Sequence, residues 1–128
     1  MVATFRTVLV IHLVAILAQA AIAGEFLSGT DSVVKFHLWV GWTVLAVGLV
    51  QTAAAGWVAR GDTRMFGTLI LSVLVALIEA LQVGTGIGRF LRVHIPLGVT
   101  VFGIVAAQTI AAFRAAVHPR VHERRADS

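Results

Sequence analysis

The chain contains no cysteine. This absence excludes disulfide bonds, iron–sulfur clusters and any haem held by a thiolate or by covalent thioether bonds. Charged residues are also scarce: they make up 12% of the 128 residues, whereas hydrophobic residues make up 59%. This composition is typical of an integral membrane protein, because so few charges cannot cover the water-exposed surface of a soluble domain.

Hydrophobic residues are concentrated in four stretches, roughly residues 3–23, 33–58, 65–85 and 90–116. Each is long enough for a helix that crosses the hydrocarbon core of a bilayer, which needs about 20 residues. Short connections make sequential helices antiparallel. The sequence therefore predicts an all-α fold, a four-transmembrane-helix bundle over residues 1–117, followed by a charged tail over residues 118–128.

The first connection is polar and rich in turn-forming residues. We expect an outer loop over residues 24–32 in which Asp31 or Ser32 caps the second helix. The first stretch has a second interpretation, because Arg6, the apolar run and an Ala-x-Ala pattern before Gly24 also occur in cleavable signal peptides. The internal repeat of the chain favours a helix of the bundle, since the first stretch is then the counterpart of the third.

The most informative pattern is this internal repeat. Residues 37–55 align with residues 94–112 at a constant shift. The paired residues include His37 with His94, Gly41 with Gly98 and Gln51 with Gln108. Two tandem hairpins of the same orientation predict a pseudo-two-fold axis along the membrane normal.

Basic residues indicate the orientation of the bundle. With the N-terminus inside, the cytoplasmic basic residues are Arg6, Arg60, Arg64, Arg114, Arg120, Arg124 and Arg125. Only Lys35, Arg89 and Arg92 then lie outside. This excess follows the positive-inside rule and predicts a multi-pass protein of the cell membrane with both termini in the cytoplasm. The alkaline pI reflects these arginines and not nucleic-acid binding, for which no aromatic and basic surface exists.

His37 and His94 are the strongest candidates for a binding site. Each lies about one helical turn from the outer start of its span, so the two residues share one depth. Imidazole is a common axial ligand of haem in cytochromes, and the pair suits opposite faces of one haem. Gly41 and Gly98 follow one turn later on the same faces. They leave room for a flat macrocycle or, equally, permit close helix packing.

Other polar residues of the spans have two interpretations each. Glu79 is an ionisable residue inside a span, which is a candidate functional site by default. It is expected to bond a ligand histidine, to exchange a proton or to contact a quinol; the alternative is a neutral acid bonded to a neighbouring helix. Arg89 and Arg92 at the outer boundary suit haem propionates or extend to the interface as membrane-anchoring residues.

Three deeper polar residues complete the set. His12 lies near the middle of the first span and has no counterpart in the repeat. We expect it to bond Gln51, Gln108 or Ser72 across the bundle. Gln51 and Gln108 are in register and are expected to bond each other across the axis.

A family resemblance adds to these residues. The segment Leu81-Gln82-Val83-Gly84-Thr85-Gly86-Ile87, followed by Val93-His94-Ile95-Pro96-Leu97-Gly98, resembles haem A synthase, in which a Leu-Gln-x-x-x-Gly segment precedes a histidine that opens the next helix. The chain corresponds to one of that enzyme's two four-helix halves. It has Val34 where the family has an acidic residue before a ligand histidine. The resemblance implies a four-helix bundle with haem held by His37 and His94.

These patterns together predict a small b-type membrane cytochrome with one haem b between His37 and His94. Iron with two axial imidazoles suits electron transfer, to a quinone in the lipid or to a redox partner on the outer side, better than a complete enzyme. One alternative is a haem carrier, sensor or assembly factor without redox turnover. Another is a cofactor-free scaffold or partner subunit. The sequence is compatible with a homodimer but does not decide the oligomeric state.

Overall fold

The computed structural model describes residues 2–117. It consists of helices α1 (Val2–Leu27), α2 (Val34–Gly61), α3 (Phe66–Ile87) and α4 (Leu91–Val117), with short 3₁₀ turns at Asp31–Val33 and Thr63–Met65. No strand occurs in this range. The predicted all-α, four-helix fold is confirmed. The predicted tail over residues 118–128, with His118 and His122, lies outside the described residues.

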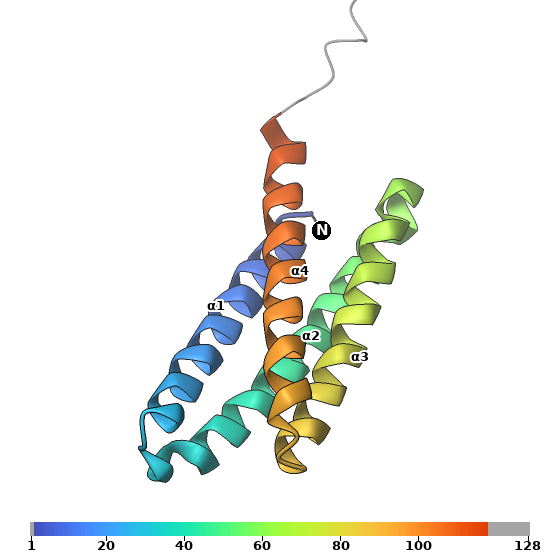
Figure 1. The fold of residues 1–128 in the computed structure, drawn as a ribbon. Coiled ribbons are helices and arrows are strands. Elements are labelled where there is room, and N and C mark those ends of the chain that lie inside the picture. The colour runs from blue at the N-terminus through green and yellow to red at the C-terminus, as the bar shows by residue number, and fades with distance from the viewer. Residues whose placement is uncertain (1, 118–128) are drawn as a thin grey trace, which may run out of the picture.

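The four helices contact one another in a ring. Helices α1 and α3 each pack against α2 and α4, so that α1 lies diagonally across from α3 and α2 across from α4. The α1–α2 and α3–α4 turns lie at the same end of the bundle (Figure 1). We call it the histidine end because His37 and His94 lie in the helix turns that follow. The opposite end, which we call the terminal end, holds the start of α1, the end of α4 and the α2–α3 turn.

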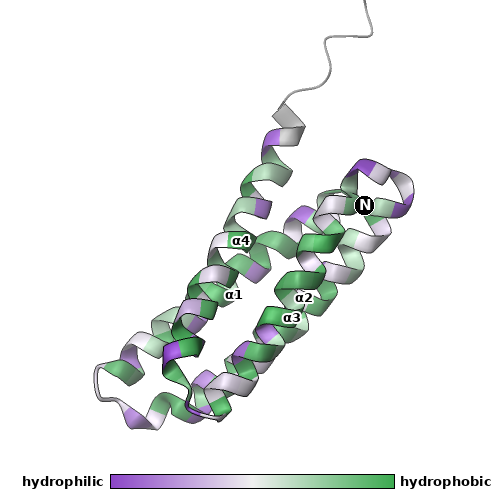
Figure 2. Ribbon diagram, turned by 45° about the vertical axis from the view of Figure 1, so that its right-hand side comes forward, coloured by the Kyte–Doolittle hydropathy of each residue, from purple (hydrophilic) through white to green (hydrophobic). Residues whose placement is uncertain are grey.

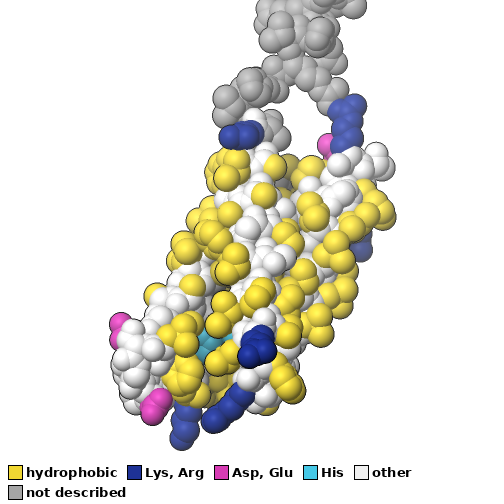
Figure 3. All heavy atoms as spheres, in the orientation of Figure 1, with side chains coloured by type: hydrophobic (Ala, Val, Ile, Leu, Met, Phe, Trp, Pro, Cys, Tyr) yellow, Lys and Arg dark blue, Asp and Glu magenta, His cyan; other side chains and the backbone are white. Residues whose placement is uncertain are grey.

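The outer surface of the bundle is apolar. All four helices are long and apolar enough to cross a membrane, and hydrophobic residues run along each of them (Figure 2). Large side chains such as Trp39 and Val99 are 72% and 67% exposed, and hydrophobic side chains dominate the visible face of the molecule (Figure 3). In water such a surface would be strongly unfavourable, whereas lipid tails match it. The chain is therefore a membrane-spanning protein.

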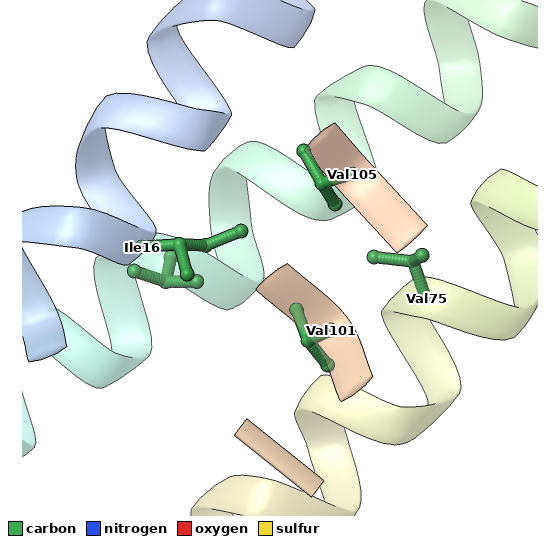
Figure 4. Close-up of a cluster of buried hydrophobic side chains, with 5 residues drawn as sticks. Ile16, Val75, Val101 and Val105 are labelled. Atoms are coloured by element: carbon green, nitrogen blue, oxygen red, sulfur yellow. The ribbon is translucent and has the colours of Figure 1, made fainter. Parts of the chain in front are cut away.

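The interior contains two hydrophobic clusters. The first joins all four helices nearer the histidine end and comprises Ile16, Val44, Val75, Val101 and Val105 (Figure 4). The second lies at the terminal end and comprises Phe5, Leu9, Ala55 and Val58. Along α1 and α2, a group of buried polar residues separates them. Among the residues whose burial the structure describes, five polar side chains are fully or almost fully buried: His12, Gln51, Ser72, Glu79 and Gln108.

The first connection differs from the sequence-based expectation. Helix α1 continues through the predicted start of the loop to Leu27, where the Ser28 backbone N–H and hydroxyl both donate to the Gly24 carbonyl. Gly29, with φ of +99°, ends this turn in a conformation that favours glycine. The predicted cap by Asp31 or Ser32 is wrong, because the 3₁₀ turn Asp31–Val33 leads directly into α2 and no side chain caps it.

Candidate functional site

The structure brings His37 and His94 together across the bundle. Their ring centroids are 6.1 Å apart and the ring planes meet at 67°. The two residues lie on the diagonally opposed helices α2 and α4, in the first turn of each. Side chains on a helix lean toward its N-terminus, so both imidazoles lean toward the histidine end, where they meet. Both residues are half-buried.

The hydrogen position on His94 follows from its backbone partner. His94 Nδ1 is 3.0 Å from the backbone oxygen of Gln82 on α3. A carbonyl oxygen only accepts hydrogen bonds, so Nδ1 carries the hydrogen and donates. In the neutral ring, Nε2 then has the free lone pair. This arrangement, with Nδ1–H held by a carbonyl, is the one that orients metal-binding histidines.

His37 has the complementary arrangement. The side-chain nitrogen of Gln19 on α1 lies 3.0 Å from the His37 backbone oxygen and 3.2 Å from His37 Nε2. The carbonyl identifies this amide atom as the nitrogen, and Nε2 therefore accepts. The hydrogen of the neutral ring is on Nδ1, which is buried and has no partner among the described residues. A metal at His37 Nε2 would have to displace the Gln19 amide.

Gly41 and Gly98 do not face open space. A Cβ atom on Gly41 would lie 3.1 Å from Gln19 Nε2, and one on Gly98 would lie 2.7 Å from Gln82 Nε2. The room expected for a macrocycle is thus filled by two amide groups from the neighbouring helices. Gln19 and Gln82 are thus residues of the site that the repeat and the histidine pair did not predict. Their signal was their polarity near the ends of otherwise apolar spans.

A third glycine shapes the other side of His94. A Cβ atom on Gly86 would lie 3.0 Å from the Cε1 atom of this imidazole. The last turn of α3 therefore packs directly against the His94 ring. The Nδ1–H of the same ring donates to the Gln82 carbonyl, which also belongs to α3. Helix α3 thus supplies both a hydrogen-bond partner and a close backbone surface for His94.

Arg89 and Arg92 lie at the histidine end with exposed side chains. Arg89 is in the turn between α3 and α4 and has a φ of 57°. Figure 3 shows basic side chains at this end of the molecule, beside a gap in which a histidine side chain is visible. The two arginines therefore lie at the same end of the bundle as the histidine pair.

Glu79 does not contact either histidine of the pair. Its carboxylate Oε1 is 2.6 Å from Nε2 of His12, on the diagonally opposed helix α1. The expected bond to a ligand histidine is therefore wrong, and the observed partner lies on the diagonally opposed helix rather than on a neighbouring one. The reason is helix direction: α3 begins at the terminal end, so the Glu79 side chain leans away from the histidine end.

The other expected polar contacts are confirmed. His12 Nδ1 is 2.7 Å from Gln51 Oε1, and Gln51 Nε2 donates to Gln108 Oε1 at 3.1 Å across the axis. Gln51 Nε2 also donates to the Ser72 hydroxyl at 3.2 Å. The hydrophobic cluster of Ile16, Val44, Val75, Val101 and Val105 separates this buried group from the histidine pair along α1, α2 and α4. On α3, Glu79 and Gln82 are one turn apart and link the two layers.

No family model, curated protein or solved structure matches this chain. The assignment of the site therefore depends on its own chemistry. No group of three or more histidine and acidic side chains that could hold a metal ion occurs in residues 2–117. Two imidazoles that approach each other from opposite helices suit a metal whose other ligands come from a bound group. A porphyrin is such a group, because its nitrogens supply the equatorial ligands.

Proposed function

We propose that the protein is an integral membrane b-type cytochrome that binds one haem b between His37 and His94. The supporting observation is the 6.1 Å separation of their ring centroids. A metal–imidazole bond of about 2 Å, plus about 1.2 Å from the nitrogen to the ring centre, puts two axial ligands roughly 6 Å apart. The spacing and the donor type therefore fit the group. The resemblance to half of haem A synthase agrees with this assignment.

The residues around the pair have defined tasks in this proposal. The Gln82 carbonyl orients the His94 ring. Gln19 and Gln82 would have to withdraw their amides from Gly41 and Gly98 to admit the macrocycle. Arg89 and Arg92 suit the propionates at the edge of the bundle. When bound, the haem supplies one-electron transfer, and the apolar helices keep water away from it.

The orientation of the bundle belongs to the same proposal. The charge distribution favours cytoplasmic termini in the cell membrane, with the histidine end on the outer side. The haem then lies near one face, so its redox partner is a quinone in the lipid or a protein on that side. The related positions of the two hairpins favour a pseudo-two-fold axis along the membrane normal.

The test is a visible spectrum of the protein purified in detergent from cells supplied with haem. We expect a sharp reduced-minus-oxidised b-type signal that is lost in both His37→Ala and His94→Ala. The matched control is His122→Ala, which removes a histidine of the tail and should leave the signal unchanged. A colourless wild-type protein, or a signal retained in both alanine variants, would contradict the proposal.

One observation favours a second function, that of a haem carrier. The lone pair of His37 Nε2 is engaged by Gln19, so haem competes with an internal ligand for this atom. Such competition suits reversible binding and release. Rapid transfer of haem to apomyoglobin, without reduction by a quinol analogue, would favour the carrier over the electron-transfer protein. A colourless protein would favour the remaining alternative, a cofactor-free scaffold in which both histidines keep their present hydrogen-bond partners.

A further inference from the structure

We call the buried polar residues in the middle of the bundle the central network; they are His12, Gln51, Ser72, Glu79 and Gln108. The hydrogen positions in this network follow from one backbone oxygen. Gln108 Nε2 lies 3.3 Å from the carbonyl oxygen of Thr68. A carbonyl accepts only, so this amide atom is the nitrogen and the other is the oxygen. The oxygen contacts Gln51, whose facing atom must therefore be its own amide nitrogen.

Ser72 supports the same assignment independently. Its hydroxyl lies 3.0 Å from the Thr68 oxygen and must donate its single hydrogen there. The hydroxyl oxygen can then only accept from Gln51 and Gln108, whose nitrogens are 3.2 and 3.3 Å away. Both amide orientations are thus fixed by two separate routes from one carbonyl.

The orientation of Gln51 fixes the tautomer of His12. The remaining Gln51 atom, Oε1, is an acceptor 2.7 Å from His12 Nδ1, so Nδ1 carries a hydrogen. On the other side of the ring, Nε2 is 2.6 Å from Glu79 Oε1. Two lone pairs would repel at this distance, so the pair must hold one proton, on Nε2 or on the carboxyl group, although neither atom has a well-directed hydrogen bond. The pair is either imidazolium with carboxylate or imidazole with carboxylic acid, and both forms have zero net charge.

We propose that the His12–Glu79 pair is an internal proton-binding site of the membrane domain, with one exchangeable proton bridging Nε2 and Oε1. Release breaks the bond of this proton to oxygen or nitrogen and leaves a charge of −1 on the pair; uptake restores neutrality. The proposal is independent of haem, because it depends only on the contacts of the central network.

The site has one route for exchange, which is through Glu79. The Gln51 amide cannot relay the Nδ1 proton, since its oxygen accepts while its nitrogen keeps both hydrogens. Glu79 is only 3% exposed, and neither of its carboxyl oxygens has a hydrogen-bond partner among the described residues: Oε1 has only the ion-pair contact with His12 Nε2, and Oε2 lacks even that. A buried oxygen without a donor costs stability, which is unexpected if the carboxyl group is only a structural link.

Helix α2 provides the space for this free oxygen. A Cβ atom on Gly48 would overlap Glu79 Oε2, so only glycine lets the carboxylate occupy its position. The groups packed around the pair are otherwise neutral: Gln51 on α2 and Gln108 on α4 are amides. The other histidines of the described range, His37 and His94, lie beyond the hydrophobic cluster toward the histidine end. No second charge among the described residues thus compensates the pair when it loses its proton.

The wild-type protein in lipid nanodiscs provides the direct test. With ¹⁵N-labelled histidine, we expect His12 to carry hydrogen on Nδ1, and a bridging hydrogen that exchanges in D₂O faster than the Nδ1 hydrogen. His12→Asn assigns the signals. The proposal is overturned by a His12 without hydrogen on Nδ1, by a neutral His12 facing an ionised Glu79 at every pH at which the protein is folded, or by a bridging hydrogen that persists in D₂O for days.

Variants provide a second, independent measurement. The bridging proton should give an infrared band, either of a carboxylic acid that shifts in D₂O or of an imidazolium. Glu79→Gln should abolish this band, and Gly48→Ala should shift or abolish it by displacing the carboxylate. Gly103→Ala is the matched control, because a Cβ there meets nothing within 4 Å. Circular dichroism establishes that each variant is folded, and an unchanged band in folded Glu79→Gln refutes the proposal.

Discussion

Gln51 holds the central network together, and its replacement by leucine should be far more damaging than the same change at Gln108. In Gln51→Leu, His12 Nδ1–H loses its partner and Gln108 Oε1 loses its donor. Each buried polar atom left unpaired costs about 1–3 kcal/mol, or roughly 2–6 kcal/mol for the two. The unfolded chain in a membrane also finds hydrogen-bond partners, and this lowers the cost of losing one in the folded state. We therefore expect Gln51→Leu to lower the free energy of unfolding by about 2 kcal/mol.

Gln108→Leu removes as many side-chain atoms but leaves only one hydrogen of the Gln51 amide nitrogen without its acceptor. Gln51 Nε2 still donates to Ser72, and the Thr68 oxygen still accepts from the Ser72 hydroxyl. The expected loss is therefore that of an average membrane hydrogen bond, about 0.6 kcal/mol.

The assay is reversible unfolding in mixed detergent and SDS micelles, followed by circular dichroism. The measured quantity is the free energy of unfolding of each variant relative to the wild type. If Gln108→Leu destabilises the bundle as much as Gln51→Leu, the hydrogen positions derived from the Thr68 carbonyl are wrong.

Two further predictions concern the haem-loaded protein. Gln19→Leu should raise haem affinity about fivefold, since it removes a competing hydrogen bond of about 1 kcal/mol; equal affinity in a titration would contradict this. Replacing Arg89 and Arg92 by glutamine should lower the potential, since positive charge favours the reduced form; no shift would place the propionates elsewhere.

The functional interpretation depends on which polar contacts cross the bundle diagonally. His37 meets His94 between α2 and α4, and His12 meets Glu79 between α1 and α3. Neither diagonal pair of helices is in direct backbone contact. Long polar side chains therefore span the axis at two levels, with a hydrophobic layer between them. Redox chemistry at one level and proton exchange at the other would be separated by about two helical turns.

Much of the fold could be predicted from composition and length alone. Four apolar stretches of sufficient length leave the backbone no alternative to helices in lipid, where every N–H and C=O must be bonded internally. The equal depth of His37 and His94 was also readable, because the repeat and the antiparallel order assign both residues to the same end. The Gln51–Gln108 bond followed from the same register.

The partners of individual side chains were decided only by the tertiary structure. Glu79 has nearly the depth of the histidine pair when counted along the sequence, yet its side chain leans along α3 toward the other end and reaches His12. Gly41 and Gly98 indicated free space, but the neighbouring helices fill it with the amides of Gln19 and Gln82. Sequence periodicity defines depth and face on one helix. The direction of each Cα–Cβ bond and the approach of the neighbouring helix determine what that face contacts.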